Sequence, residues 1–309
     1  MKPFISIIIP VQNGGKTIKK CLDSLKNLNY ANYELIVIDD NSSDATPEIL
    51  RQYPPLAGGR GWKIKTQGLT STGPSACRNL AIKQAKGEYL AFTDADCLVH
   101  PEWLNELLKG FEEEDVVGVG GDQQSPQDET DFGKLVQDFL KTVGFVADYV
   151  KKEKKKIETK HNPTCNVMYK KEIFDKVGGF LEGLWPGEDV ELDYRIKKPG
   201  YKLIYNPEAI VYHYRPDNLS AFCQMMKNYG QAQGFLIRKY GLFRLIHYEP
   251  MCLLLLLGIC IINFKLGMFC LLLCFIILFV KLKSMRFMKL LAVTIIYWNL
   301  GFVKGLIAK

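Results

Sequence analysis

The chain has 309 residues and a net charge of +7 at pH 7, and 48% of its residues are hydrophobic. A basic balance suggests an anionic partner, but no nucleic-acid recognition motif accompanies the charge, so we expect no nucleic-acid partner. The nine cysteines form neither a CxxC pair nor the Cys/His spacing of a zinc site, and no secretory signal precedes the first apolar run, which indicates reduced thiols in a cytoplasmic domain.

The first hundred residues alternate short apolar runs with amphipathic stretches. Residues 18–25 carry an apolar stripe with helical spacing, and a second helical stretch begins at Pro74. The apolar runs are typical of strands that are covered on both faces, and they span 6–10, 34–39, 62–66 and 89–92. This order predicts an α/β fold in which a mostly parallel central sheet has right-handed crossovers and helices on both faces.

Two acidic pairs come at the ends of two of these strands. Asp39 and Asp40 end the second strand, and Asp94 and Asp96 follow the fourth. Parallel sheets bind ligands beyond the carboxyl ends of their strands, so we expect both pairs at one edge. Burying unpaired carboxylates is costly, and a divalent cation that carries a phosphate would satisfy them. A helix cap or turn explains Asp94 and Asp96 equally well from this stretch alone.

Beyond residue 100 the regular alternation of strands and helices breaks down. We expect strands at 116–120 and 167–169, helices at 132–149 and 171–177, and a further helix from Glu188. The lysine-rich residues 151–160 are expected to form a loop. This part of the chain is therefore predicted to be mixed in topology.

The C-terminal sixty residues are dominated by Leu, Ile, Phe, Val and Met. Residues 251–264 and 266–280 are apolar runs, each shorter than the roughly 20 residues that span a bilayer comfortably. They could form one long tilted helix or a hairpin that turns near 263–267. A hairpin returns the four cations of 281–289 to the cytoplasmic side, which the positive-inside rule favours. We therefore expect a catalytic domain, 1–240, and a membrane-associated region, 241–309, with a hairpin at about 250–280 and a third apolar segment at about 287–306.

Seven short motifs occur in order over residues 4–240. They are Ser6-Ile-Ile-Ile-Pro-Val-Gln-Asn13, Val37-Ile-Asp-Asp-Asn-Ser-Ser-Asp44, Gly73-Pro-Ser-Ala-Cys-Arg-Asn79, Gly87-Glu-Tyr-Leu-Ala-Phe-Thr-Asp-Ala-Asp96, Gly178-Gly-Phe180, Gly187-Glu-Asp-Val-Glu-Leu192 and Val211-Tyr-His213. Together they resemble the inverting glycosyltransferases of family 2. The resemblance implies a GT-A fold, which is Rossmann-like, followed here by C-terminal hydrophobic membrane helices.

The resemblance also implies roles for residues of a nucleotide-sugar donor site. Asp40 would accept the imino hydrogen of a pyrimidine base, in a pocket shaped by Pro10 and Asn13. Asp94 would lie near the ribose and the sugar. Arg78 would contact phosphate, for which its planar guanidinium is suited, although a surface ion pair is the alternative.

A metal site and a catalytic base are implied by the same resemblance. Asp96, the second carboxylate of the DxD motif, would bind Mg²⁺ or Mn²⁺ on the diphosphate, with His213 as a further ligand or as a structural histidine. Asp189 would be the base that deprotonates the acceptor, with Glu188 beside it in the donor site. The alternative is that Glu188 and Asp189 are favourable first-turn carboxylates of a helix, and both readings can hold.

Two departures from the family pattern narrow the expected activity. Gln12 stands where an aromatic residue is frequent, so base stacking would differ in detail. The Gln-x-x-Arg-Trp signature of processive synthases is absent from the sequence. We therefore expect the addition of one sugar or a few, and not the extrusion of a long polymer.

The predicted function is that of a metal-dependent inverting glycosyltransferase at the cell membrane, with its catalytic domain on the cytoplasmic side. Its partners would be a nucleotide-diphosphate sugar and a lipid-linked or cell-surface glycan acceptor. A non-catalytic membrane scaffold that binds nucleotide sugars is the first alternative. A nucleotidyltransferase is the second alternative. It would need a phosphate-binding loop after the first strand, and Gln12-Asn-Gly-Gly-Lys16 resembles such a loop only weakly.

Overall fold

The structure is a computed structural model, and it describes residues 2–53, 62–66, 73–143 and 154–308. Contacts within the chain divide it into two compact units. The first consists of 1–130 and 147–215, and the second of 131–146 and 216–309. The second unit thus begins before the boundary that we expected at residue 240, because the helix that ends at Tyr240 packs along the C-terminal helix.

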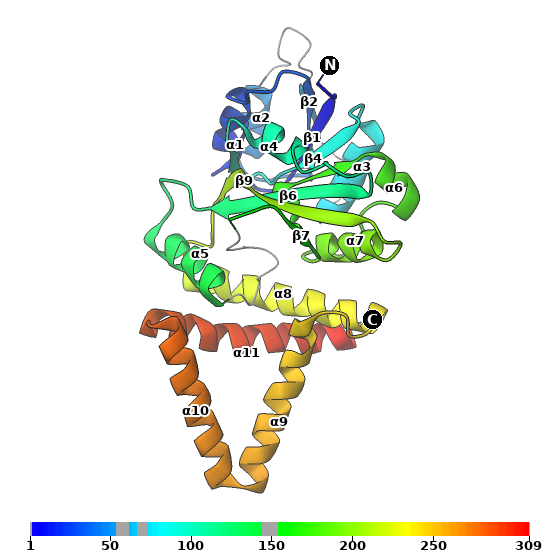
Figure 1. Ribbon diagram of the computed structural model, residues 1–309. Helices are drawn as coiled ribbons and strands as arrows, with labels where there is room; N and C mark the ends of the chain where they lie inside the picture. The colour runs from blue at the N-terminus through cyan, green and yellow to red at the C-terminus, as the bar shows by residue number, and fades with distance from the viewer. Residues whose placement is uncertain (1, 54–61, 67–72, 144–153, 309) are drawn as a thin grey trace. The chain divides into compact units, whose positions relative to one another are not determined.

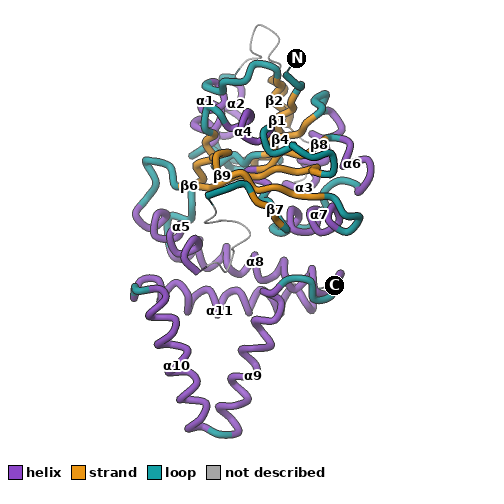
Figure 2. Tube along the Cα trace, in the orientation of Figure 1, coloured by secondary structure: helices purple, strands orange, loops and turns teal. Residues whose placement is uncertain are grey.

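The first unit is built on one mixed sheet, to which the described residues contribute nine strands (Figures 1 and 2). The strand order is β3-β2-β1-β4-β8-β6-β9-β5, and β7 pairs with β9. The strands are β1 Ile5–Val11, β2 Tyr33–Asp39, β3 Trp62–Thr66, β4 Tyr89–Phe92, β5 Cys97–Val99, β6 Val116–Gln124, β7 Ile157–Thr159, β8 Val167–Lys170 and β9 Lys202–His213.

The sheet has a parallel half and a mixed half. Strands β3, β2, β1 and β4 are parallel, as the alternating sequence predicted. The strands after residue 100 add antiparallel pairs, β4 with β8 and β6 with β8, beside the parallel pair of β6 and β9. Part of the expected loop at 151–160 is strand β7, while 151–153 lie outside the described residues.

Helices cover both faces of this sheet and bury two apolar layers. One face packs against α1, α2 and α4, and the other against α3, α6 and α7. The predicted stripe of α1 is buried on the first of these faces, which is the reason that this stretch is helical. The helices are α1 Ile18–Lys26, α2 Thr46–Arg51, α3 Gly73–Gln84, α4 Trp103–Leu108, α6 Glu172–Val177 and α7 Glu188–Lys197, with a 3₁₀ turn, η1, at Thr164–Asn166.

The second unit is helical. It contains α5 Asp131–Val143, α8 Leu219–Tyr240, the 3₁₀ turn η2 at Leu245–Tyr248, α9 Glu249–Ile262, α10 Phe264–Leu282 and α11 Met285–Ile307. Asn263 separates α9 from α10 and caps α10 by accepting a hydrogen bond from the Leu266 amide, 3.1 Å. Residues 144–149 of the helix expected at 132–149 lie outside the described part of the chain.

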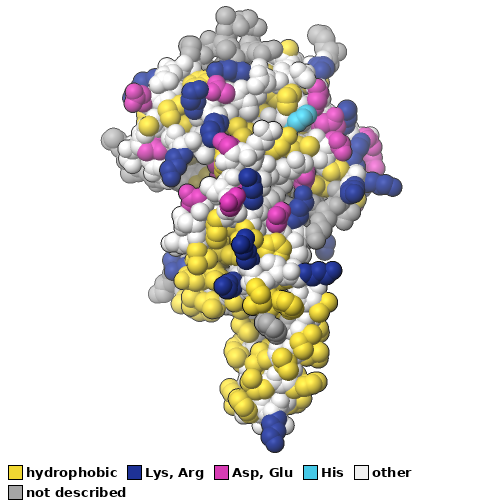
Figure 3. Space-filling model, turned by 90° about the vertical axis from the view of Figure 1, so that its left-hand side faces the viewer, with side chains coloured by type: hydrophobic (Ala, Val, Ile, Leu, Met, Phe, Trp, Pro, Cys, Tyr) yellow, Lys and Arg dark blue, Asp and Glu magenta, His cyan; other side chains and the backbone are white. Residues whose placement is uncertain are grey.

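Apolar side chains dominate the surface of the α9–α10 hairpin, as Figure 3 shows. None of the described side chains of α9 is buried. By length and composition, two segments could cross a membrane, Leu245–Ile262 and Met285–Ile307, and a shorter apolar helix spans Phe264–Val280. The three apolar segments therefore coincide with helices that leave their apolar surface largely uncovered, except where α11 packs on α8.

Helices α8 and α11 run in parallel with their backbones in contact (Figure 1). Each helix carries a Gly-x-x-x-Gly motif, with glycines at 230 and 234 in α8 and at 301 and 305 in α11. A Cβ atom at Gly301 would lie 1.9 Å from the Lys227 carbonyl oxygen, and one at Gly230 would lie 1.9 Å from the Trp298 carbonyl oxygen. Small residues are required here because any side chain would force the two backbones apart.

We expect Gly301→Ala to weaken the α8–α11 pair. The added methyl group has no space, and overpacking of this kind typically costs about 1–3 kcal/mol. The measurement is thermal unfolding of the full chain in one detergent. Gly258→Ala on α9 is the matched control, because a Cβ atom at Gly258 meets nothing within 4 Å. Equal melting temperatures for the two variants would contradict the close approach.

Candidate active site

A cavity of about 530 Å³ opens at the carboxyl ends of β1, β2 and β4. Residues from all three strand ends line it, together with the start of α3 and residues 183–185. Six of the predicted site residues lie in its wall, and they are Pro10, Asn13, Asp40, Arg78, Asp94 and Asp96. Both acidic strand ends thus face one cavity, as the parallel order of β1, β2 and β4 led us to expect.

The part of the cavity at β1 and β2 is held by short hydrogen bonds. Asp40 is buried, and its Oδ2 accepts a hydrogen bond from the Gly73 amide at 2.7 Å. Gln12 donates to the Asp40 carbonyl oxygen at 3.0 Å. The Asn13 side chain accepts a hydrogen bond from the Ser43 amide at 2.8 Å, which joins the loops that follow the two strands. These hydrogen bonds tie the ends of β1 and β2 to each other and to the start of α3.

Arg78 lies between two carboxylates. Its guanidinium is 2% exposed and donates to Glu188 Oε1 at 2.6 Å and to Asp94 Oδ1 at 2.7 Å. We expected Arg78 to contact a phosphate or to form a surface ion pair. The ion pairs exist but they are buried, and they use one N–H of each terminal nitrogen out of the five N–H donors of the guanidinium. A phosphate role for Arg78 stays a prediction, and its visible role is to hold Asp94 and Glu188 together.

Glu188 and Asp189 form the first turn of α7. Gly187, just before them, has φ of +98°, a left-handed conformation that glycine adopts without strain. Burial raises the pKa of Glu188 to about 8, and Asp189 adds to this shift while Arg78 opposes it. Asp189 is also nearly buried, and its carboxylate accepts hydrogen bonds from the Val190 amide at 2.8 Å and the Thr164 amide at 3.4 Å.

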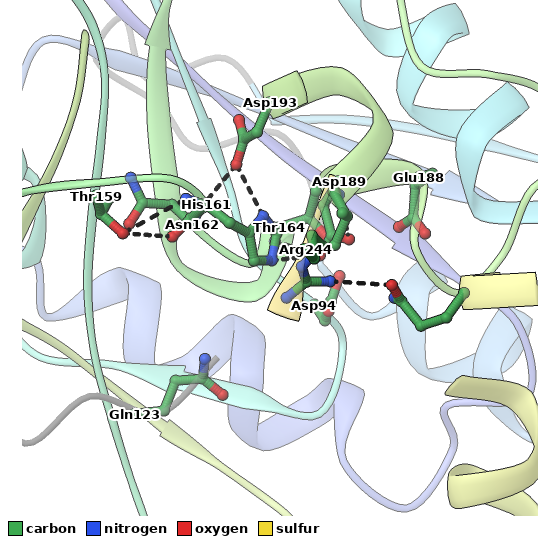
Figure 4. Close-up of polar contacts among 12 residues, drawn as sticks. Asp94, Gln123, Thr159, His161, Asn162, Thr164, Glu188, Asp189, Asp193 and Arg244 are labelled. Carbon is green, nitrogen blue, oxygen red and sulfur yellow. Dashed lines mark hydrogen bonds and ion pairs between the residues drawn. The ribbon is translucent and has the colours of Figure 1, made fainter. Parts of the chain in front are cut away.

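A buried histidine, His161, lies next to the Asp189 carboxylate, as Figure 4 shows. His161 Nδ1 lies 2.9 Å from Asp193 Oδ2, and His161 Nε2 lies 3.7 Å from Asp189 Oδ2. Asp193 also accepts hydrogen bonds from the Tyr169 hydroxyl at 2.7 Å and from the Asn162 amide at 2.8 Å. Since its carboxylate accepts the hydrogen on Nδ1, Asp193 turns the other ring nitrogen of His161 toward Asp189.

Sequence reasoning did not single out His161 or Asp193. One signal was available, because Asp189 and Asp193 are four residues apart and must share a face of α7. The position of His161 could not be found in this way, since it comes from the segment that follows β7 and meets α7 only in the folded chain.

Asp96, the second carboxylate of the DxD motif, lies next to His213. His213 Nε2 is 3.5 Å from Asp96 Oδ2, and His213 Nδ1 is 3.1 Å from Gln123 Oε1. Burial acts to raise the pKa of Asp96, but His213, together with a backbone hydrogen bond and Arg215, outweighs it, so the pKa lies below its ordinary value. A carboxylate oxygen and an imidazole nitrogen at this spacing are suitable ligands for one divalent cation. The pair therefore fits the metal that the family resemblance implies.

The family described as glycosyl transferase family 2 matches residues 6–178. Glycosyltransferase AglE of Haloferax volcanii is 30% identical over 251 residues, which cover 78% of this chain and 77% of the relative. A Methanococcus voltae enzyme, dolichyl N-acetyl-alpha-D-glucosaminyl phosphate 3-beta-D-2,3-diacetamido-2,3-dideoxy-beta-D-glucuronosyltransferase, is 27% identical over 257 residues and covers 80% of this chain and 78% of its own.

A solved structure shares the fold. The mannosyltransferase PcManGT from Pyrobaculum calidifontis, solved in complex with GDP-Man and Mn²⁺, superposes with a TM-score of 0.71 at 19% sequence identity. The match covers 100% of this chain and 88% of that one. The GT-A fold expected from the sequence motifs is therefore confirmed, with a mixed sheet as its centre.

Proposed function

Because the chain belongs to glycosyl transferase family 2, we propose that it transfers a sugar from a nucleotide diphosphate to a lipid-linked acceptor at the membrane, with inversion at the anomeric carbon. The observation that carries the proposal is the single cavity shared by the acidic ends of β2 and β4. Asp40 would bind the base, with Pro10 and Asn13 shaping the pocket. Asp94 would face the ribose and the sugar.

Asp189 is the proposed base. An acceptor hydroxyl attacks the anomeric carbon and passes its proton to the Asp189 carboxylate, while the bond from that carbon to the nucleotide diphosphate breaks. A single displacement from the opposite side inverts the configuration. The amides of Val190 and Thr164 and the ring of His161 hold the Asp189 carboxylate in place for this step. Arg78 ties Asp94 of the cavity wall to Glu188, the neighbour of Asp189.

Asp96 and His213 would hold the divalent metal, Mg²⁺ or Mn²⁺. When bound, the metal stabilises the negative charge that develops on the departing diphosphate. Two features of this chain prepare the pair for that task. The side chain of Asp96 is 47% exposed toward the cavity, and Gln123 turns the Nε2 atom of His213 toward Asp96.

The helical unit supports the proposed acceptor class. The hairpin of α9 and α10 has uncovered apolar side chains. Such a hairpin suits insertion into the bilayer, because insertion removes this apolar surface from water. The name of the Methanococcus voltae relative specifies a dolichyl-phosphate-linked sugar as the acceptor, and we propose the same chemical class here. Lys283, Arg286 and Lys289 follow α10 or begin α11, and under the positive-inside rule their charge supports a catalytic unit on the cytoplasmic side.

A donor panel tests the proposal. The purified full chain in nanodiscs is mixed with UDP-, GDP- and TDP-sugars, with and without Mn²⁺, and its thermal unfolding is followed. A donor at one hundred times its Kd adds about 2.7 kcal/mol, or about 5–10 °C for a unit of this size. We expect this shift for one nucleotide class only, and only with the metal.

Asp96→Asn is the variant for this test. It should remove the metal-dependent part of the shift, because an amide is a weaker ligand for a divalent cation than a carboxylate. Asp175→Asn, on the exposed surface of α6, is the matched control. Release of free nucleoside diphosphate on adding a lipid-linked sugar supports glycosyl transfer, whereas release of pyrophosphate would show a nucleotidyltransferase. A donor-induced shift without any turnover would show a scaffold.

A further inference from the structure

Two cysteines and a histidine form a second possible metal site beside the DxD motif. Among the residues that the structure describes, one group of three His, Cys, Asp or Glu side chains has ligand atoms that all lie within 4.8 Å of one another, and it consists of Cys97, Cys165 and His213. We propose that this group binds a thiophilic divalent cation such as Zn²⁺.

The sheet places two of the three ligands. Cys97 begins β5 and pairs directly with His213, the last residue of β9, in the antiparallel ladder. Residues directly opposite each other in such a ladder project to the same side. The closeness of Cys97 and His213 is therefore set by backbone hydrogen bonds and does not depend on a chance side-chain rotamer.

The third ligand comes from η1, which is anchored on several sides. The Cys165 carbonyl accepts a hydrogen bond from the Thr93 hydroxyl at 3.0 Å. The next residue, Asn166, accepts one from the indole of Trp103 at 2.8 Å and donates to the carbonyl oxygens of Asp122 and Ala209, each at 2.8 Å. Cys165 is thus held in place by buried contacts, and both thiols are buried, at 0% exposure for Cys97 and 4% for Cys165.

The tautomer of His213 suits metal binding. Gln123 Oε1 faces His213 Nδ1 at 3.1 Å, and the same oxygen accepts a hydrogen bond from Arg215 at 2.9 Å. Because that amide atom is an acceptor, it holds a ring hydrogen on Nδ1, so Nε2 is the nitrogen that a metal can take in exchange for its hydrogen. Metal-binding histidines typically have such a second partner, which fixes the ring and the tautomer. Gln123 serves in this role whichever ion His213 binds.

The ligand chemistry distinguishes this site from the donor's metal site. Thiolates favour Zn²⁺ and other soft ions, whereas Mg²⁺ and Mn²⁺ favour oxygen ligands. Tetrahedral Zn²⁺, with bonds of about 2.3 Å to sulfur and 2.0 Å to nitrogen, needs ligand atoms about 3.5–3.8 Å apart. The observed group needs to close by at most about 1.3 Å to reach this geometry. Asp96 Oδ2 lies 3.5 Å from His213 Nε2 but outside this group of three, so it would have to move to serve as a fourth ligand.

The shared ligand gives the site a consequence for the proposed function. Zn²⁺ held by the thiols takes His213, which would otherwise hold the donor's metal together with Asp96. The soft ion would therefore inhibit sugar transfer by competing for His213. This regulatory step rests on the proposed function, whereas the binding of the ion does not.

Cobalt substitution tests the binding site itself. The reduced, metal-free full chain in nanodiscs is titrated with Co²⁺, which reports thiolate ligands by a charge-transfer absorption in the near ultraviolet. We expect this band to saturate at one equivalent and to disappear when Zn²⁺ is added. Absence of the band in the wild-type chain would overturn the proposal, whether or not the protein transfers sugar.

Variants assign the ligands. Cys97→Ser and Cys165→Ser should each weaken Zn²⁺ binding by more than about 100-fold, and Gln123→Ala by about 10–100-fold, as is usual for an outer-shell partner. Cys223→Ser on α8 is the control and should change nothing. A band that persists in the double Cys97→Ser, Cys165→Ser variant would refute the assignment.

A measurement on the wild-type chain covers the case in which these variants do not fold. Bound Zn²⁺ should protect Cys97 and Cys165, but not Cys223, from alkylation in a mass-spectrometric assay. Equal labelling of all three thiols with and without Zn²⁺ would contradict the site. In the transfer assay, one equivalent of Zn²⁺ should inhibit the wild-type chain, and each cysteine variant should lose this inhibition relative to its own rate without Zn²⁺.

Discussion

Replacing Asp189 with Asn is expected to lower kcat by about 10²–10⁴-fold, the usual contribution of a positioned general base. Asn cannot take the proton of the acceptor hydroxyl, yet it keeps the size of the side chain at the start of α7. Donor binding should be nearly unchanged, because Asp189 is not part of the wall of the donor cavity. The measurement is single-turnover transfer with saturating donor, alongside donor-induced thermal stabilisation of the same protein.

The two readouts separate a catalytic effect from a folding defect. Loss of both transfer and donor-induced stabilisation would indicate a damaged site, and it would leave the base assignment without support. Transfer at the wild-type rate would remove Asp189 as the base. Asp175→Asn should behave like the wild type in both assays, since Asp175 is exposed on α6.

Replacing Arg78 with Met should cause the largest loss of stability among the site variants. Arg78 is 2% exposed and is the partner of two carboxylates, of which Glu188 is also buried. Removing one partner of a buried ion pair typically costs about 3–5 kcal/mol, because a charge is left without compensation. Taking the lower figure, since burial already raises the pKa of Glu188 to about 8, we expect a fall in melting temperature of about 6–12 °C.

Two further measurements identify the cause of this loss. The double variant Arg78→Met, Glu188→Gln should recover part of the stability, because a neutral amide replaces the uncompensated carboxylate. The deficit of Arg78→Met relative to the wild type should also shrink as the pH falls, since protonated carboxyls need no cationic partner. Arg51→Met, on the exposed end of α2, should stay within about 0.5 kcal/mol of the wild type. A deficit that is independent of pH and of Glu188 would point to lost packing instead.

Much of the fold and part of the site could be predicted from the sequence. The strands β1, β2 and β4 are short apolar runs, and alternation with helices implies parallel pairing. Parallel strands end at a common edge, so Asp40 and Asp96 were expected to face one cavity, and both line it. The break at Asn263 between α9 and α10 lies within the stretch where a hairpin was expected to turn. These features follow from local patterns of apolar and polar residues.

The partners of individual side chains could not be predicted in this way. Arg78 was expected at a phosphate or in a surface ion pair, yet it is buried between Asp94 and Glu188, which are 16 and 110 residues away along the chain. The glycines that join α8 and α11 are spaced regularly within each helix, but nothing in the spacing says which helix they meet.

The sequence by itself determined the α/β class, the edge of the sheet where the acidic strand ends meet and the apolar C-terminal helices, because each depends on the periodicity of neighbouring residues. Only the tertiary structure decided that His161 backs Asp189 and that Cys97, Cys165 and His213 converge. Both groupings bring together residues from the mixed half of the sheet and the segments around it, where no simple repeat relates sequence separation to distance in space. The cysteines therefore showed no zinc spacing in the sequence, although the fold places two of them beside a histidine.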